Sequence, residues 1–278
     1  SVMSAVMLTS VISPVQAAEE PSWKTSMKDH WSFDSEKSDQ GNKTTATLNG
    51  ISIVDSKDPV FGKVLRFGSG TDKYLKLDNY INTGKGATSF SMWYRYDTTI
   101  TGDGADKSAV LLQHEGAGRS LLTLQPDGKY NTFINEQNVA SKKSVRKGDW
   151  QHVTVVFDQE KKEVTYYVNG EFDSTQSMGT KKVDQKLALR LGAHKNEGNK
   201  DPHPMRGDVD EFYVYEKALT ADEAKAIYED KAAELYEQEL QKLIQKGKDL
   251  AENQPLPEDN EKAKQLKDAL ETAEDAAT

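Results

Sequence analysis

The apolar residues of this chain recur with a period of two over most of its length, in short runs separated by turn residues. A period of two places every second side chain on one face of an extended segment, so each run predicts a half-buried β-strand. Eleven strands are predicted, at residues 51–54, 63–67, 73–77, 88–96, 108–113, 119–125, 130–134, 150–157, 163–168, 186–191 and 207–215. Asn169-Gly170 is the strongest turn signal, because a two-residue hairpin turn needs positive φ twice. Short strands without interleaved helices predict a mainly β, antiparallel two-sheet jelly-roll sandwich.

The periodicity becomes helical near Ala218. Thr220 and Glu223 can form a capping box, in which each side chain accepts a hydrogen bond from the other residue's backbone N–H. The apolar residues that follow are spaced by three, four and one, and form one stripe: Ala224, Ile227, Tyr228, Ala232, Leu235, Tyr236, Leu240, Leu243 and Ile244. A helix that continues to about residue 250 is about 45 Å long. Its first two turns can pack on the sandwich, and the rest must leave a compact domain.

The helical stripe ends near two prolines. Pro255 and Pro257 interrupt the first helix, and a second is predicted from about Asp259, with the apolar face Leu266, Ala269, Leu270 and Ala273. Residues 230–278 are therefore predicted to form a helical hairpin that acts as a spacer. Because the pattern is still helical where the chain stops, we expect this spacer to be truncated and further domains to follow.

The charge is distributed unevenly along the chain. Lys and Arg number 36 against 45 Asp and Glu, a net charge of −9. Residues 220–278 contain sixteen acidic and eight basic residues, so the preceding part is almost balanced. Phosphate binding requires a surface excess of Lys and Arg, so no nucleic-acid partner is expected. With no cysteine, a disulfide framework, a thiolate metal site and a cysteine nucleophile are excluded.

The N-terminus is apolar and uncharged from Val2 to Ile12, which is too short for a bilayer span. Small residues at Val15 and Ala17 suit a signal peptidase, so residues 1–17 are interpreted as the remnant of a signal peptide and 18–28 as a linker. The alternative is a disordered apolar N-terminus or an anchor remnant. Export without cysteine is typical of a secreted or cell-surface protein of a Gram-positive bacterium. No membrane span is expected in the mature chain.

Several motifs appear in a fixed order from about residue 29 to 229. They are Trp31-Ser32-Phe33-Asp34, residues 62–68, Phe90-Ser91-Met92-Trp93, Trp150-Gln151-His152-Val153, Phe157-Asp158, Tyr167-Val168-Asn169-Gly170, Leu191-Gly192, residues 207–215 and Ala218-Leu219-Thr220. In this order the chain resembles the laminin-G-like, concanavalin-A-like jelly-roll family. From residue 148 to 220 it is also similar to the lectin modules associated with bacterial sialidases. Residues 236–273 resemble the helical repeats that link domains in Gram-positive surface glycosidases. The resemblance implies a sugar-binding or adhesive module.

Some jelly rolls of this kind hydrolyse glycosides, which requires a carboxylic acid and a carboxylate on opposite sides of the scissile bond. The nearest pattern is Asp208-Val209-Asp210-Glu211. Strand alternation predicts that Glu211 points away from Asp208 and Asp210, so no acid pair is expected. The five histidines occur in no recognisable catalytic or metal-binding spacing. We therefore expect no enzyme active site in this segment.

A structural calcium ion is a further expectation, because carboxylates brought together by a Greek key suit a hard cation. Asp34 and Asp210 are the candidate ligands, since the resemblance implies that the first and last strands lie side by side. The alternative is that both carboxylates only cap turns or accept backbone amides.

Sugar binding requires aromatic faces and planar polar groups. The candidates on loops are His114, Arg119, Tyr130 and His194, with the neighbouring Lys195 and Asn196; Arg95 and Arg190 lie on strands and could pair with an acidic sugar. Each has a structural alternative, such as packing in a hairpin or an ion pair with a nearby Asp. Trp93, Trp150, Val153 and Phe157 are expected in the core, and His152 as a hydrogen-bonded internal histidine. Arg206-Gly207-Asp208 spells an integrin-type tripeptide, but its Gly-Asp begins a predicted strand, so it is discounted.

The sequence thus predicts a non-catalytic carbohydrate-binding module of a secreted or surface-attached bacterial multidomain protein, with a glycan or polysaccharide as its partner and a glycosidase as the expected parent. Two alternatives are a catalytic jelly-roll glycoside hydrolase, which needs a carboxylate pair in one cleft, and a protein-binding or structural module, which needs an exposed apolar patch.

Overall fold

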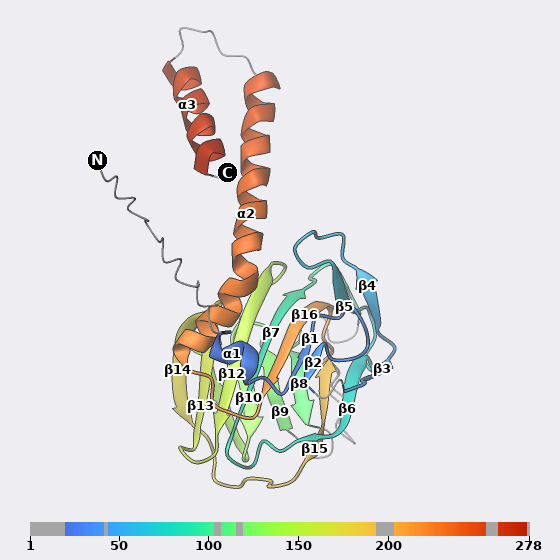
Figure 1. The fold of residues 1–278 in the computed structure, drawn as a ribbon. Helices are drawn as coiled ribbons and strands as arrows, with labels where there is room; N and C mark the ends of the chain where they lie inside the picture. Colours follow the sequence, from blue (N-terminus) through green and yellow to red (C-terminus); the bar gives the residue numbers. More distant parts are fainter. Residues whose placement is uncertain are drawn as a thin grey trace, which may run out of the picture.

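The computed structural model describes residues 20–41, 44–102, 107–114, 119–192, 203–253 and 261–276. Two antiparallel sheets are stacked on each other, and a long helix leaves the sandwich at one end (Figure 1). This confirms the predicted mainly β, antiparallel jelly-roll sandwich with a C-terminal helical hairpin.

The first sheet has nine strands, and we call it the helix-side sheet because the helices lie on its outer face. Its main path is β14 (Glu171–Ser177), β13 (Glu163–Val168), β12 (Trp150–Asp158), β7 (Ala87–Tyr96), β16 (Gly207–Tyr215), β1 (Asp29–Trp31) and β2 (Gln40–Gly41). Beside β16 also lies β5 (Lys63–Phe67), which pairs with β4 (Ser52–Asp55). The first and last strands, β1 and β16, are neighbours, as predicted.

The second sheet has seven strands, and we call it the opposite sheet. Its order is β11 (Gln137–Ala140), β10 (Tyr130–Ile134), β9 (Arg119–Leu124), β8 (Ala109–His114), β15 (Leu187–Gly192), β6 (Tyr74–Ile81) and β3 (Thr47–Asn49). All pairings in both sheets are antiparallel, for example β12 with β7 through nine residue pairs from Trp150↔Arg95 to Asp158↔Ala87.

The main core lies between the two sheets and consists of the inward-facing residues of the alternating strands. Val153 and Phe157 are fully buried there, as predicted. Trp93 is also buried, but on the outer face of the helix-side sheet, and Trp150 is half-buried beside it. The strands therefore bury aromatic residues on both faces of this sheet.

The hairpin at Asn169-Gly170 forms as predicted, with φ of 50° and 77° at the two turn residues. Its second arm, β14, was not predicted, because the sequence EFDSTQS is polar and has no clear alternation. β1, β2, β3 and β11 were also absent from the predicted strands, and each has four residues or fewer. Short or polar strands have too few apolar residues to show a period.

Helix α2 (Ala221–Asn253) begins with the predicted capping box. The N–H of Glu223 donates to Thr220 Oγ1 over 3.2 Å, and the N–H of Thr220 donates to the Glu223 carboxylate over 3.1 Å. The first half of the helix, which we call the proximal half (Ala221–Tyr236), packs on the helix-side sheet: Ala224 and Ile227 join the tyrosines of β13 and β16. The short helix α1 (Ser22–Thr25) packs on the same face through Trp23.

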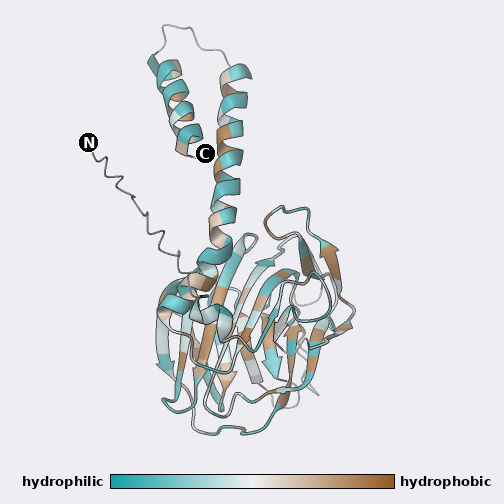
Figure 2. Cartoon of the chain, in the orientation of Figure 1, coloured by the Kyte–Doolittle hydropathy of each residue, from teal (hydrophilic) through white to brown (hydrophobic). Residues whose placement is uncertain are grey.

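The distal half of α2 (Glu237–Asn253) extends away from the sandwich and pairs with α3 (Glu261–Ala276), so residues 230–278 include the predicted hairpin (Figure 1). A continuous helix of 33 residues is about 50 Å long. It runs through residue 230, where the sequence suggested the start of the spacer. Most residues of both helices in the hairpin are hydrophilic (Figure 2).

No stretch of α2, α3 or any other helix among the described residues is apolar and long enough to span a bilayer. The predicted signal-peptide remnant, residues 1–17, lies outside the described residues. The interpretation of that segment therefore stays a prediction, as does the similarity of residues 236–273 to helical linker repeats.

Candidate functional site

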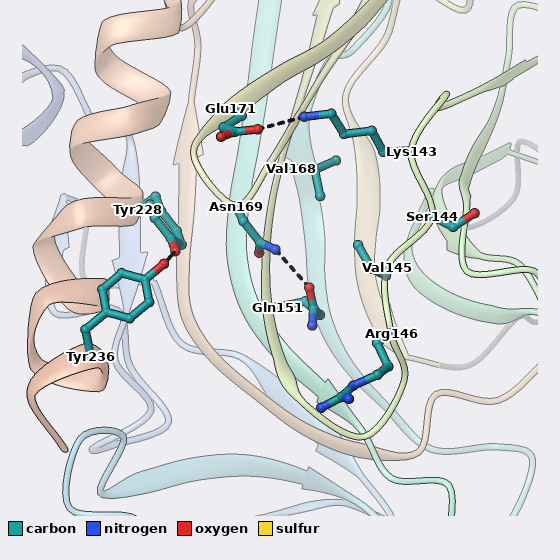
Figure 3. A pocket seen from close by; sticks show the side chains of 10 residues that line it. All are labelled: Lys143, Ser144, Val145, Arg146, Gln151, Val168, Asn169, Glu171, Tyr228 and Tyr236. Atoms are coloured by element: carbon teal, nitrogen blue, oxygen red, sulfur yellow. Dashed lines mark hydrogen bonds and ion pairs between the residues drawn. The ribbon is translucent and has the colours of Figure 1, made fainter. Parts of the chain in front are cut away.

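A groove lies between the proximal half of α2 and the turn between β13 and β14. It consists of two adjoining hollows of about 470 and 530 Å³, which share Asn169, Glu171, Tyr228 and Tyr236. The first hollow extends to the loop of residues 143–146 and the second to the start of α2 at residues 221–225. We call the two together the helix groove; Figure 3 shows the first hollow.

Two tyrosines form the helix wall of this groove. Tyr228 and Tyr236 are eight residues apart, which brings them to the same side of α2, and their hydroxyls are hydrogen-bonded at 2.5 Å. The Tyr228 ring stacks on Trp93 with 5.3 Å between ring centroids. Gly170 meets the other edge of Tyr228, since a Cβ at Gly170 would lie 2.6 Å from Tyr228 Cδ1. Tyr228 is thus held in place, whereas Tyr236 is 62% exposed.

Two side-chain amides line the first hollow together with these rings, Asn169 from the turn between β13 and β14 and Gln151 from β12. Asn169 Nδ2 donates to Gln151 Oε1 over 2.9 Å, and Asn169 Oδ1 accepts from the backbone N–H of His152 over 2.8 Å. Figure 3 shows Gln151 turning its amide nitrogen away from Asn169. The amides are therefore oriented before any ligand binds, which is the arrangement that recognises hydroxyl groups with little loss of entropy.

Five of the six charged residues that line the groove are in ion pairs, and the sixth, Asp222, lines the second hollow. Lys143 Nζ lies 2.7 Å from the Glu171 carboxylate, and Lys225 lies 3.5 Å from Glu229. Arg146, in the first hollow, pairs with Asp149 beside it at 2.5 Å. The hydrogen bond from Lys143 lowers the pKa of Glu171 below its usual value. The groove thus presents rings, amides and paired charges.

Four of the residues predicted to contact sugar have described side chains, and none of these four lines the helix groove. Arg95 lies on the outer face of the helix-side sheet, where Asp208 accepts a 2.6 Å bond from it and two from Arg66. Arg190 is 2% exposed on β15, with its guanidinium 3.8 Å above the Tyr74 ring.

His114 and Tyr130 are fully buried. His114 lies opposite Leu189, so it and Arg190 point to opposite faces of the sheet. The Tyr130 hydroxyl bonds to that of Tyr94 at 2.8 Å inside the core, and burial raises its pKa well above the usual value. As placed, neither offers surface to a ligand. The Arg119 side chain and His194, with Lys195 and Asn196, lie outside the described parts.

The carboxylates of the last strand are buried beneath α2. A register shift between Asp210 and Tyr213, with φ of 47° at Glu211, interrupts the alternation. Glu211 therefore contacts Tyr213 and Lys231 on the outer face, and the expectation that it points away from Asp210 was wrong, because a bulge adds one residue to the strand. His30 lies 2.5 Å from Glu211.

The environments of this pair shift their pKa values in opposite directions. Burial and the adjacent Glu211 charge raise the pKa of Asp210 to about 9, whereas hydrogen bonds and the charges of His30 and Lys231 outweigh burial and lower that of Glu211 to about 2. An acid beside a carboxylate suits glycoside chemistry. These two are only 1% and 9% exposed, however, and Glu211 is occupied by three partners, so they do not face a substrate site.

The candidate calcium ligands lie at the same end of β1 and β16. Asp34 follows β1 and is exposed, and its charge contributes to the raised pKa of Asp210. One carboxyl oxygen of Asp210 is buried without a hydrogen-bond partner. The described residues contain no group of three or more His, Cys, Asp or Glu arranged to hold a metal ion.

Three other sequence interpretations can be compared with the structure. His152 is fully buried and bonds to Ser91 Oγ at 2.8 Å, which confirms an internal histidine; burial lowers its pKa to about 3. Arg206-Gly207-Asp208 is buried, in agreement with its dismissal as an adhesion motif. The sequence assigned Tyr228 and Tyr236 to the apolar stripe of the helix. The groove becomes visible only in the structure, where both tyrosines lie beside the Asn169-Gly170 turn. The sequence signal was an aromatic pair on an otherwise aliphatic stripe.

A family model described as the concanavalin A-like lectin/glucanases superfamily matches residues 69–225. The chain belongs to this superfamily. The match confirms the family that the motif order suggested, and it covers β6 to β16, which belong to both sheets, and the start of α2. None of the curated protein sequences compared with the chain matches it.

Solved structures that are similar to this chain include two toxin binding domains and one domain of an arabinanase. The binding domain of Paraclostridial mosquitocidal protein 1 is 20% identical with a TM-score of 0.56, over 75% of this chain and 53% of that one. A second similar structure is domain 4 of AbnA, an extracellular GH43 arabinanase from Geobacillus stearothermophilus, in complex with arabinotriose. It is 20% identical with a TM-score of 0.55, and the match covers 73% of this chain and 98% of that domain. The binding domain of botulinum neurotoxin DC, in complex with rat synaptotagmin II, is 13% identical with a TM-score of 0.57, over 75% and 52%.

The chain therefore spans about half the length of the toxin binding domains that it matches. At these identities the similarity establishes the fold of this superfamily member. The family resemblance concerns the sandwich, whereas the helix groove depends on how α2 lies across it.

Proposed function

We propose that this domain is a non-catalytic carbohydrate-binding module and that the helix groove binds the glycan. The observation that carries the proposal is the pair of tyrosine rings on α2, held opposite the oriented amides of Asn169 and Gln151. A tyrosine face packs against the C–H groups of a sugar ring, and planar amides pair with its hydroxyls. The arabinotriose-bound domain of the arabinanase shows that a similar sandwich takes sugar.

The groove lacks the features of a glycosidase centre. Hydrolysis needs one carboxylic acid that keeps its proton and one carboxylate. The described carboxylates of the groove are Glu171, common to both hollows, and Asp222 and Glu229 in the second. Lys143 lowers the pKa of Glu171, which disfavours its acid form, and Glu229 is held in an ion pair with Lys225. The Asp210 and Glu211 pair has the contrasting pKa values, but the two residues are only 1% and 9% exposed. These points favour binding over catalysis.

The wider role follows from the sequence interpretations. We propose that the module belongs to a secreted or surface-attached protein of a Gram-positive bacterium, with further domains that include a glycosidase. A binding module keeps an attached enzyme close to its polymer by raising the effective concentration of substrate. The helical hairpin would then separate the sugar-binding sandwich from the next domain.

A structural calcium ion at Asp34 and Asp210 is a second part of the proposal. The unpartnered Asp210 oxygen and the neighbouring ends of β1 and β16 support it. Calorimetric titration of calcium into the chelator-treated chain should show binding that the Asp210→Asn variant loses. Equal heats of calcium binding for the wild-type chain and the Asp210→Asn variant would show that Asp210 is not a calcium ligand.

The main test is a glycan array probed with the full chain, with and without chelator. Tyr236→Ala should lose the array signal at unchanged stability, because Tyr236 is 62% exposed. Leu243→Ala is the matched control, since Leu243 lies seven residues further along the same helix, is 65% exposed and lies outside the groove. A flat array for the unmodified chain would reject the proposal in favour of a protein-binding or structural module.

A further inference from the structure

We infer that the helix groove takes an internal stretch of a neutral, linear glycan, an inference that rests on the proposed function. The first observation is the arrangement of the two hollows. They adjoin at the tyrosine pair and share four lining residues, so a ligand in one hollow meets a ligand in the other. Each hollow is within the range of about 300–1,000 Å³ that encloses a small ligand.

The groove also follows the helix over a considerable length. From Ala221, in the second hollow, to Tyr236, shared by both, the helix rises about 22 Å. A single terminal sugar would occupy one hollow and leave the other filled with water. A glycan that crosses the tyrosine pair contacts both hollows. It gains the contacts of both hollows but loses the translational and rotational entropy of binding only once.

The rings that contact the chain are distributed along this path. Tyr228 and Tyr236 lie at the centre, and Phe172, 55% exposed on β14, lies in the second hollow only. Successive sugar rings can stack on successive aromatic faces, and this favours a linear polymer.

The preference for a neutral glycan follows from the charges of the groove: five of its six charged residues are in ion pairs, and the sixth, Asp222, is acidic and would repel an anionic sugar. Lys143 is bound to Glu171 and Lys225 to Glu229 inside the groove, and Arg146 to Asp149 beside it. An acidic sugar would have to displace a carboxylate that already sits 2.5–2.7 Å from Lys143 or Arg146. Hydroxyl groups can instead hydrogen-bond to the paired charges without separating them. The groove therefore suits an uncharged glycan better than a uronic or sialic acid.

The test is affinity electrophoresis of the full chain in gels that contain one polysaccharide each. The neutral probes are arabinan, xylan, mixed-linkage glucan and galactomannan; the acidic probes are hyaluronan and polygalacturonate. We expect retardation by at least one neutral probe, with a dissociation constant that changes less than about twofold between low and high salt. Retardation by acidic probes alone, or a loss of more than about tenfold in high salt, would overturn neutrality while leaving sugar binding intact.

Chain length is tested by competition with oligomers of two to six units from the retarding polymer. Affinity should rise at least about tenfold over this series, and variants at the two ends, Ser144→Ala in the first hollow and Phe172→Ala in the second, should each weaken hexamer binding several-fold while Leu243→Ala does not. Equal affinity for dimer and hexamer, or no effect of either end variant, would overturn the internal-stretch inference alone. No retardation by any probe would overturn the proposed function together with it.

Discussion

The two halves of α2 have the same kind of apolar stripe but lie in different surroundings. In the proximal half, Ala224, Ile227 and Ala232 are buried against the helix-side sheet, and the two tyrosines line a groove. In the distal half, Ile244 is buried, while Leu243 and Leu250 are 65% and 52% exposed. An amphipathic pattern therefore shows that a helix has an apolar face, and it does not show what covers that face.

The comparison also explains why the binding groove and the spacer occur in one helix. The capping box sets where α2 begins, and Lys231 fixes its third turn to Glu211 of β16 at 3.0 Å. Beyond Tyr236 the helix leaves the sheet and pairs with α3. Helix α2 thus forms one wall of the helix groove in its proximal half and connects the sandwich to α3 in its distal half.

The largest effect is expected where the proximal half is buried. Ile227→Ala should lower the free energy of unfolding by about 2–5 kcal/mol, because it leaves a cavity between α2 and the tyrosines of the sheet. Urea unfolding followed by tryptophan fluorescence measures this directly, since all four tryptophans precede α2. A change below about 1 kcal/mol would show that α2 does not pack on the sheet in solution.

The next effect concerns the contact between the hairpin turn and α2. Gly170→Ala should cost about 1–2 kcal/mol for a left-handed backbone and should also weaken glycan binding, because the new methyl group collides with Tyr228. Gly86→Ala is the matched control: its φ is also positive, at 59°, but a Cβ there meets nothing within 4 Å. If both variants bind glycan equally well, Tyr228 is not part of the site.

A smaller, pH-dependent effect is expected at the start of the helix. Hydrogen bonds from Lys217, Ser22 and Thr220 lower the pKa of Glu223 from its usual 4.5, despite partial burial. The stabilisation is therefore present above about pH 4.5 and is lost as the pH falls through the lowered value. Glu223→Ala should cost about 1 kcal/mol at pH 7 and less in acid. Glu223→Gln keeps the capping geometry and should lose the pH dependence. If the difference in unfolding free energy between Glu223→Gln and the wild type stayed constant with pH, the Glu223 carboxylate would not be the source of the pH dependence.

The smallest effect is expected in the distal half. Leu243→Ala and Leu250→Ala should each change the unfolding free energy of the sandwich by less than about 0.5 kcal/mol, since both side chains are exposed. The same urea titration at two protein concentrations checks this. A loss above about 1 kcal/mol that depends on concentration would show that the distal stripe is covered by a second copy.

The sequence predicted much of the fold but little of the site. Alternation of apolar residues predicted the long strands. The Asn169-Gly170 pair predicted the hairpin, and Thr220 with Glu223 predicted the start of α2. Each of these signals is local in the sequence. The polar strand β14, the bulge at Glu211 and the positions of Arg95, Arg190 and Tyr130 were not predictable in this way. Whether a strand residue faces the core, the helix or solvent depends on which element packs on that face.

By itself, the sequence determined the sandwich, the start of α2 and the absence of any cysteine chemistry, since these depend on residue type, spacing and turn geometry. Only the tertiary structure decided that α2 crosses the sheet beside the Asn169-Gly170 turn, so that Tyr228 and Tyr236 face Asn169 and Gln151. These residues are far apart in the chain, and their approach depends on the burial of the proximal apolar stripe, which no local pattern specifies.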